Sequence, residues 1–197
     1  MKNIPKILLS MFLIVTLAFS FTACAKTEMT EENITDTVST VETALKEFDS
    51  KTLEKYVSSS TLSYIMKYAE NHQQFVDLGK AIFKDLEITV TSVDVENGTV
   101  TLDVKNKNLK TAASIFALNL KDKYTAMQLL QKLDDEAFLD ESLGTLVDSI
   151  NSSKDTVEAT VTLKVVQGKR NLVLSFDDAG EDAVSGGALT GIKNIYK

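Results

Sequence analysis

The sequence predicts an α+β domain, in which an antiparallel sheet made of two β-hairpins packs against several short helices. Apolar and polar residues alternate over residues 86–104 and again over residues 157–176, the period of half-buried strands. Before, between and after these stretches, apolar residues recur three and four positions apart, as on one face of a helix. Four antiparallel strands with helices on one side form an α+β architecture.

Several short helices are expected before the first strand pair. Thr35 or Asp36 can cap the first helix, because their side-chain oxygens accept hydrogen bonds from free backbone N–H groups. Its apolar face comprises Val38, Val41, Leu45 and Phe48. Asp49 and Ser50 then break this helix, and the serines at 58–60 break the chain again before two further apolar stripes. The pattern therefore indicates separate helices and not one long rod.

The first hairpin is expected to turn at Asn97-Gly98. This dipeptide between alternating runs favours a type I′ turn, in which both central residues have positive φ. Counting from the turn gives the pairs Val95 with Val100 and Val93 with Leu102. The alternation shifts phase after Val90, so a β-bulge is expected near Thr91 or Ser92.

The rest of the chain predicts two amphipathic helices, a second hairpin and a closing helix. The first of these helices has the apolar positions Ile115, Leu118, Tyr124, Met127, Leu130 and Leu133, and the second runs from Phe138 to Ile150. The second hairpin turns at Gln167-Gly168-Lys169. Residues 183–196 form the closing helix. Gly186-Gly187 within it indicates either close backbone packing or a helix that starts only after the pair.

The N-terminus has the pattern of a secretory signal. Lys2 and Lys6 precede an apolar run over residues 7–21, and small residues lead to Cys24, the only cysteine of the chain. The run is shorter than the roughly 20 apolar residues that cross a bilayer. An uncleaved anchor and a buried core cysteine are the alternatives.

The segment Phe21-Thr22-Ala23-Cys24 resembles the lipobox of bacterial lipoproteins of the Gram-positive type, with Phe21 in place of the usual Leu. The resemblance implies cleavage before Cys24 and acylation of its thiol, for example with palmitate. Two or more acyl chains anchor a protein stably. We therefore expect a signal peptide over residues 1–23, a lipidated N-terminus and spacer over 24–34, and one extracytoplasmic domain over 35–197. The polar spacer could hold this domain about 30 Å from the cell membrane.

Charge narrows the possible partners. The 21 basic residues less Lys2 and Lys6 leave 19 against 28 acidic ones, a net charge of about −9 after cleavage. This balance argues against nucleic-acid binding and against electrostatic adhesion to anionic lipid. The bilayer partner is therefore reached through acylated Cys24. No internal disulfide can form with a single cysteine.

A second resemblance concerns the domain itself. Residues 44–50, the strand exit over 104–109 and the tail with Gly186-Gly187 are similar to uncharacterised lipoproteins of Gram-positive bacteria. That resemblance implies an NTF2-like or cystatin-like fold, a curved cone-shaped sheet wrapped around a helix. The roughly 40-residue helical stretch between the hairpins departs from the NTF2 pattern.

No motif predicts catalysis, a metal or a cofactor. His72 is the only histidine and is expected at the surface, and a lone imidazole without a second ligand forms no typical zinc site. No Gly-x-Ser-x-Gly or phosphate-binding glycine motif is present. Two acidic clusters are expected to be solvated loops, Asp134 to Glu141 and Asp177 to Asp182. The tyrosines at 56, 64, 68, 124 and 196 are expected in core or half-buried positions.

Three functions follow as hypotheses. The first is a non-catalytic binding module outside the membrane for a small ligand, a peptide or an envelope protein; the ligand-binding residues are unknown at this stage. The second is a structural or inhibitory interaction module that acts through its sheet face or a strand edge. The third is an NTF2-like enzyme. A deep apolar cavity containing His72 or a buried carboxylate would favour the enzyme, and a filled cone would favour a partner-binding role.

Overall fold

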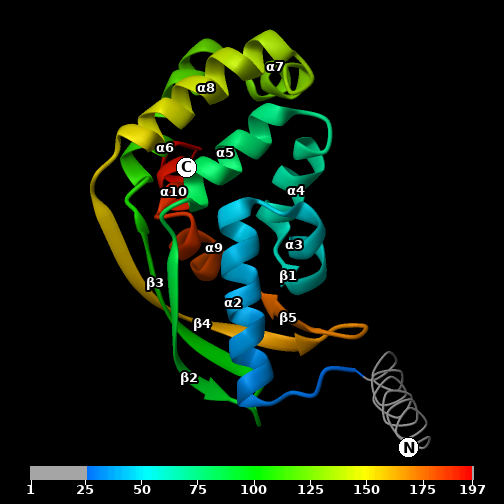
Figure 1. Ribbon diagram of the computed structural model, residues 1–197. Coiled ribbons are helices and arrows are strands. Elements are labelled where there is room, and N and C mark those ends of the chain that lie inside the picture. Colours follow the sequence, from blue (N-terminus) through cyan, green and yellow to red (C-terminus); the bar gives the residue numbers. More distant parts are fainter. Residues whose placement is uncertain (1–25, 197) are drawn as a thin grey trace, which may run out of the picture.

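The computed structural model describes residues 26–196 (Figure 1), so the predicted signal peptide, the Phe21-Thr22-Ala23 box and Cys24 lie outside the described residues. The described part is α+β, as predicted, with nine helices and five strands. In chain order these are α2 Glu31–Glu47, α3 Ser50–Tyr56, β1 Val57–Ser58, α4 Ser60–Ala69, α5 Gln73–Phe83, β2 Glu87–Asp94, β3 Thr99–Lys107, α6 Lys110–Lys123, α7 Ala126–Gln131, α8 Glu136–Ser152, β4 Thr156–Gln167, β5 Leu172–Ser175, α9 Asp178–Val184 and α10 Ala188–Tyr196.

The five strands form one mixed sheet in the order β1-β5-β4-β3-β2. The pairs β2–β3, β3–β4 and β4–β5 are antiparallel, whereas β1 pairs parallel with β5 through Val57 opposite Leu174. The expectation of a purely antiparallel sheet was therefore wrong at this edge. A two-residue strand within a serine-rich break is too short to show alternation, which is why the sequence pattern missed it.

The turn between β2 and β3 is longer than predicted. Val93, not Val95, lies opposite Val100, so residues 95–98 form a four-residue connection. Asp94 accepts hydrogen bonds from Asn97 N (2.9 Å) and Asn97 Nδ2 (2.7 Å), and Gly98 alone in this turn has positive φ (60°). The aspartate thus stabilises a wider turn than type I′. The strand register shifts between Val90 and Ser92, within the region where a bulge was expected.

The first helix starts earlier than predicted. Thr30, not Thr35 or Asp36, caps α2, because its side chain accepts a hydrogen bond from Asn33 N (3.2 Å). Ile34, assigned to the spacer, is fully buried in α2. The negatively charged Glu31 and Glu32 follow the cap, where the helix dipole favours them.

The helical stretch between the hairpins comprises three helices and not two. Helix α6 ends at Lys123, and Thr125 and Gln128 then form a capping box that starts α7. Four apolar side chains predicted on a buried face are exposed instead, namely Ile115, Leu118, Met127 and Leu130. No helix within residues 26–196 has both the length and the apolar composition of a membrane span.

Two apolar clusters form the core. The larger one lies between the sheet and α2 and includes Ile34, Leu45, Leu102 and Leu174. The smaller one joins α5, α6, α8 and α10 and includes Leu109, Leu139 and Ile150. Figure 1 shows α2 lying against the curved sheet, while α5, α6 and α8 gather at the opposite end of the molecule from the start of α2. Polar residues of β3 and β4, such as Asp103, Thr160 and Thr162, leave the other sheet face to solvent.

Candidate functional site

An apolar cavity lies where the two core clusters meet. Its volume is about 170 Å³. Helices α2, α4, α5, α6, α8, α9 and α10 all contribute to its wall, which includes the aromatic rings of Phe83, Phe116 and Phe176 and the aliphatic side chains of Leu146, Ala113 and Ile192. An engineered cavity of about 150 Å³ with a similar aliphatic and aromatic lining stays free of water and binds benzene. The volume therefore suits a ligand with about six carbon atoms.

The C-terminal part of the chain contributes two separate helices, α9 and α10, to the cavity wall. Gly186 and Gly187 both have positive φ (61° and 81°), so α9 ends before them and α10 begins after them. Gly186 O accepts a hydrogen bond from Leu109 N (2.8 Å), and a Cβ on Gly186 would lie 1.9 Å from Lys107 O. The glycine pair therefore packs closely against the end of β3 and also precedes the start of a helix, so both expected alternatives are confirmed. The single helix predicted over 183–196 was wrong.

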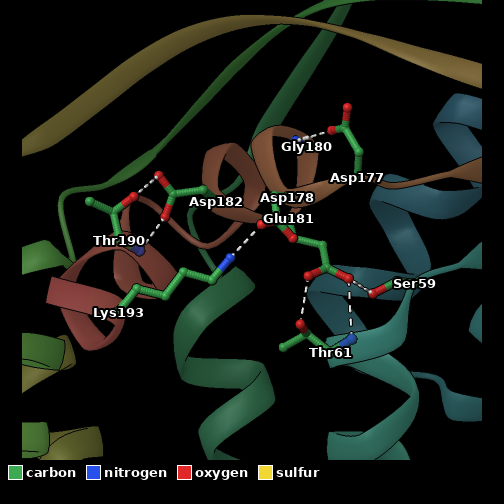
Figure 2. A network of polar contacts seen from close by, with 9 residues as sticks. All are labelled: Ser59, Thr61, Asp177, Asp178, Gly180, Glu181, Asp182, Thr190 and Lys193. Carbon is green, nitrogen blue, oxygen red and sulfur yellow. Dashed lines mark hydrogen bonds and ion pairs between the residues drawn. The ribbon is translucent and has the colours of Figure 1, made fainter. Parts of the chain in front are cut away.

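The wall of the cavity contains one buried carboxylate, that of Glu181 in α9, which is 7 % exposed. Its Oε1 accepts hydrogen bonds from Ser59 Oγ (2.5 Å) and Thr61 N (3.2 Å), and its Oε2 accepts one from Thr61 Oγ1 (2.6 Å). Figure 2 shows these three bonds crossing from α9 to the start of α4. The positive end of the α4 dipole also favours this negative charge.

The bonds of Glu181 are those of a structural group and leave little capacity for chemistry. Ser59 Oγ, which donates to the carboxylate, also accepts from Leu62 N (3.0 Å) as the cap of α4. Both carboxylate oxygens therefore accept hydrogen bonds from Ser59 and Thr61, which are fixed at the start of α4. A general base needs a carboxylate oxygen that can reach the proton of a substrate. The arrangement instead fastens α4 to α9 beside the cavity.

Further polar contacts fix the position of α9 (Figure 2). Asp177 caps the helix by accepting from Gly180 N (2.9 Å). Asp182 accepts from Thr190 N (2.7 Å) and Thr190 Oγ1 (2.8 Å), which joins α9 to α10. Asp178 bonds Lys193 Nζ at 2.6 Å, and this hydrogen bond raises the pKa of Lys193 above its usual 10.5.

A buried asparagine ties the two core clusters together near the cavity. Asn106 in β3 is 1 % exposed, and its Nδ2 donates to Ile82 O (3.0 Å) and Val184 O (2.7 Å). Its Oδ1 accepts from Lys107 N (2.7 Å). One side chain thus bonds α5, α9 and its own strand, and Ile82 and Val184 both line the cavity.

The expectation for the acidic cluster at 177–182 was wrong. Residues 178–184 are helical, Glu181 is buried, and Asp182 is half-buried. The missed signal is the position of Glu181 three residues before Val184, which places the carboxylate on the apolar face of α9. The other cluster, Asp134 to Glu141, is exposed at its acidic positions, but Glu136, Asp140 and Glu141 lie in α8 and not in a loop. There Asp135 caps α8, and the hydrogen bond from Phe138 N lowers the pKa of this aspartate.

His72 is not the surface residue that was predicted. Its side chain is 11 % exposed, and its Nε2 lies 3.5 Å from Asp134 Oδ1. Its Nδ1 is buried without a hydrogen-bond partner among the described residues. His72 does not line the cavity, so it is separated from Glu181. The tyrosine expectation holds for residues 56, 68 and 124 but fails for Tyr64 and Tyr196, which are exposed.

Within residues 26–196 no group of three or more His, Cys, Asp or Glu side chains is placed to hold a metal ion. Comparisons of the chain with protein-family models, curated proteins and solved structures find no match.

Proposed function

We propose that the protein is a lipid-anchored, non-catalytic binding protein whose cavity takes a small, neutral, apolar ligand. The single observation that carries the ligand class is the wall of the 170 Å³ cavity, which is almost entirely aliphatic and aromatic. Burying a charged group there would be costly because the wall offers it no free partner. The one carboxylate in the wall, Glu181, is held by Ser59 and Thr61.

The hydrogen bonds of Glu181 also help to decide between a binding protein and an enzyme. A buried carboxylate in an apolar cavity was the feature expected of an NTF2-like enzyme. Here both oxygens of Glu181 accept hydrogen bonds from the protein, and His72 lies outside the cavity wall. We therefore favour binding over proton transfer.

We also propose, as the finer description of the fold, an NTF2-like cone. The support for it is the curved sheet with α2 against one face (Figure 1), together with the apolar cavity between the two core clusters. The parallel strand β1 and the three helices between β3 and β4 depart from that pattern.

A second candidate, a protein-interaction module of the cell envelope, is favoured by exposed apolar side chains. Ile115 is 56 % exposed on α6, and Met127 and Leu130 are 65 % and 63 % exposed on α7. Exposed apolar side chains mark a surface that contacts a partner where they form a contiguous patch. The ligand-binding function is preferred because the cavity has a defined volume and wall.

Calorimetric titration tests the ligand class. The chain from residue 24 onward, titrated with 1-hexanol, should bind, whereas hexanoate and hexylammonium of the same length should not. Ala113→Leu projects a larger side chain from the cavity wall and should abolish the binding of 1-hexanol. Ala137→Leu on the exposed face of α8 is the matched control. Equal affinity for the neutral and the charged probes would rule out the proposed ligand class.

Metabolic labelling tests the anchor. In the native host, the wild-type chain should incorporate labelled palmitate and remain with the membrane. Cys24→Ala should lose the label and be either uncleaved or released, because the thiol that accepts the acyl chain is gone. Continued palmitate incorporation by Cys24→Ala would contradict acylation at this residue.

A further inference from the structure

We infer that one defined end of the domain, the turn end, faces the bilayer and that the ligand cavity lies away from the lipid. The turn end comprises residues 26–30, the β2–β3 turn over 95–98 and the β4–β5 turn over 168–171. This inference rests on the proposed acylation of Cys24, and it concerns how the anchored domain is oriented.

The chain that leads from the anchor is bound to the domain almost at once. Thr27 N and Thr27 Oγ1 both donate to Arg170 O, at 2.9 and 2.8 Å. Met29 packs against the larger core cluster, and its sulfur would lie 3.5 Å from a Cβ built on Gly98. Thr30 then caps α2. Residues 27–30 are therefore part of the domain and not a free spacer.

These contacts shorten the tether. Only Ala25 and Lys26 separate Cys24 from Thr27. Three residue steps span at most about 10 Å, compared with the 30 Å expected for a free spacer. Acyl chains on Cys24 would hence hold the Arg170 turn at the level of the lipid headgroups.

The rest of the fold extends away from this end. Helix α2 has 17 residues and is about 26 Å long, and it runs from the turn end towards α5. Figure 1 shows α7 and α8 at the far end of the molecule. No residue of the turn end lines the cavity. A bilayer at the turn end thus leaves the cavity wall to the aqueous side.

The tether, and not surface charge, determines this orientation. Lys26, Lys169 and Arg170 are exposed at the turn end, but Glu28 and Glu96 are exposed there as well. Mixed charges of this kind give little net attraction to anionic headgroups. With a longer tether the domain should therefore lose its fixed orientation, although the protein should remain anchored in the membrane.

Lipid-headgroup quenching tests the orientation in the full chain. Because acylated Cys24 offers no thiol and the chain has no other cysteine, Lys169→Cys and Met127→Cys each provide one site for a fluorophore. In membranes containing nitroxide-headgroup lipids, the label at 169 should lose its fluorescence and the label at 127 should keep it. Inserting a flexible Gly-Ser segment of about ten residues between Lys26 and Thr27 should restore the fluorescence at 169.

Palmitate incorporation in the same samples separates the two proposals. An acylated protein with equal quenching at both labels, or with unchanged quenching after the insertion, would overturn the orientation alone. Absence of acyl label on the unmodified chain would overturn the anchor and, with it, this orientation.

Discussion

At the scale of single residues, Glu181 is the most informative side chain. It is buried and forms no direct ion pair with the described residues, and its charge is balanced by three hydrogen bonds and by the start of α4. A buried carboxylate with such partners stabilises the packing of the elements that it joins. Removing the carboxylate would leave its buried hydrogen-bond donors without an acceptor. Asn106 has the same role between β3, α5 and α9.

Removing the carboxylate should therefore destabilise the fold. Glu181→Ala leaves Ser59 Oγ, Thr61 N and Thr61 Oγ1 without their acceptor and should lower the free energy of unfolding by about 3 kcal/mol. Glu181→Gln keeps one acceptor oxygen and should cost less. Urea denaturation measures both, with Glu54→Ala as the control, because Glu54 is exposed on α3 and its side chain forms no hydrogen bond or ion pair with the described residues. A Glu181→Ala variant as stable as the control would show that these bonds contribute nothing.

At the scale of elements, the connection between α9 and α10 positions much of the cavity wall. The positive φ of Gly186 and its contact with Lys107 O allow the chain to turn closely over the end of β3. The same connection places Leu109 N against Gly186 O, at the point where α6 begins. The glycine pair is thus the link between the sheet and the second core cluster.

A side chain at this position should not be tolerated. Gly186→Ala would put a Cβ 1.9 Å from Lys107 O at a φ of 61°, and should destabilise the protein by at least about 3 kcal/mol. Gly144→Ala is the matched control, since Gly144 lies exposed within α8 with nothing near its Cβ position. That control should gain about 1 kcal/mol. Thermal unfolding in which the two variants shift alike would contradict this account of the turn.

The elements also show what local pattern can and cannot predict. Alternation located β2, β3, β4 and β5, because each has one buried face. It did not reveal the wide turn that Asp94 stabilises or the helix break at Thr125, because both depend on specific side-chain hydrogen bonds. Short β1 depends on its partner β5, which lies more than 100 residues away in sequence.

At the scale of the whole molecule, the cavity results from an incomplete fit between two cores. The sheet and α2 form one apolar cluster, α5, α6, α8 and α10 form the other, and the space remains between them. No local pattern predicts such a space, because its wall is assembled from seven helices. The class of the fold was accessible from sequence, whereas the site was not: Glu181 was assigned to a solvated loop, and the cavity residues were assigned only to helix faces.

The measurement that tests the central claim most directly is native mass spectrometry of the protein purified from its own membranes. The wild-type chain should carry, beyond the acyl groups on Cys24, one small neutral ligand. Ala113→Leu should carry the same acyl groups and lack that ligand, because its larger side chain occupies the cavity. The control Ala137→Leu should match the wild type. A wild-type chain and an Ala113→Leu chain with the same bound mass, or a wild type that binds nothing, would contradict the proposal that the cavity is the functional site.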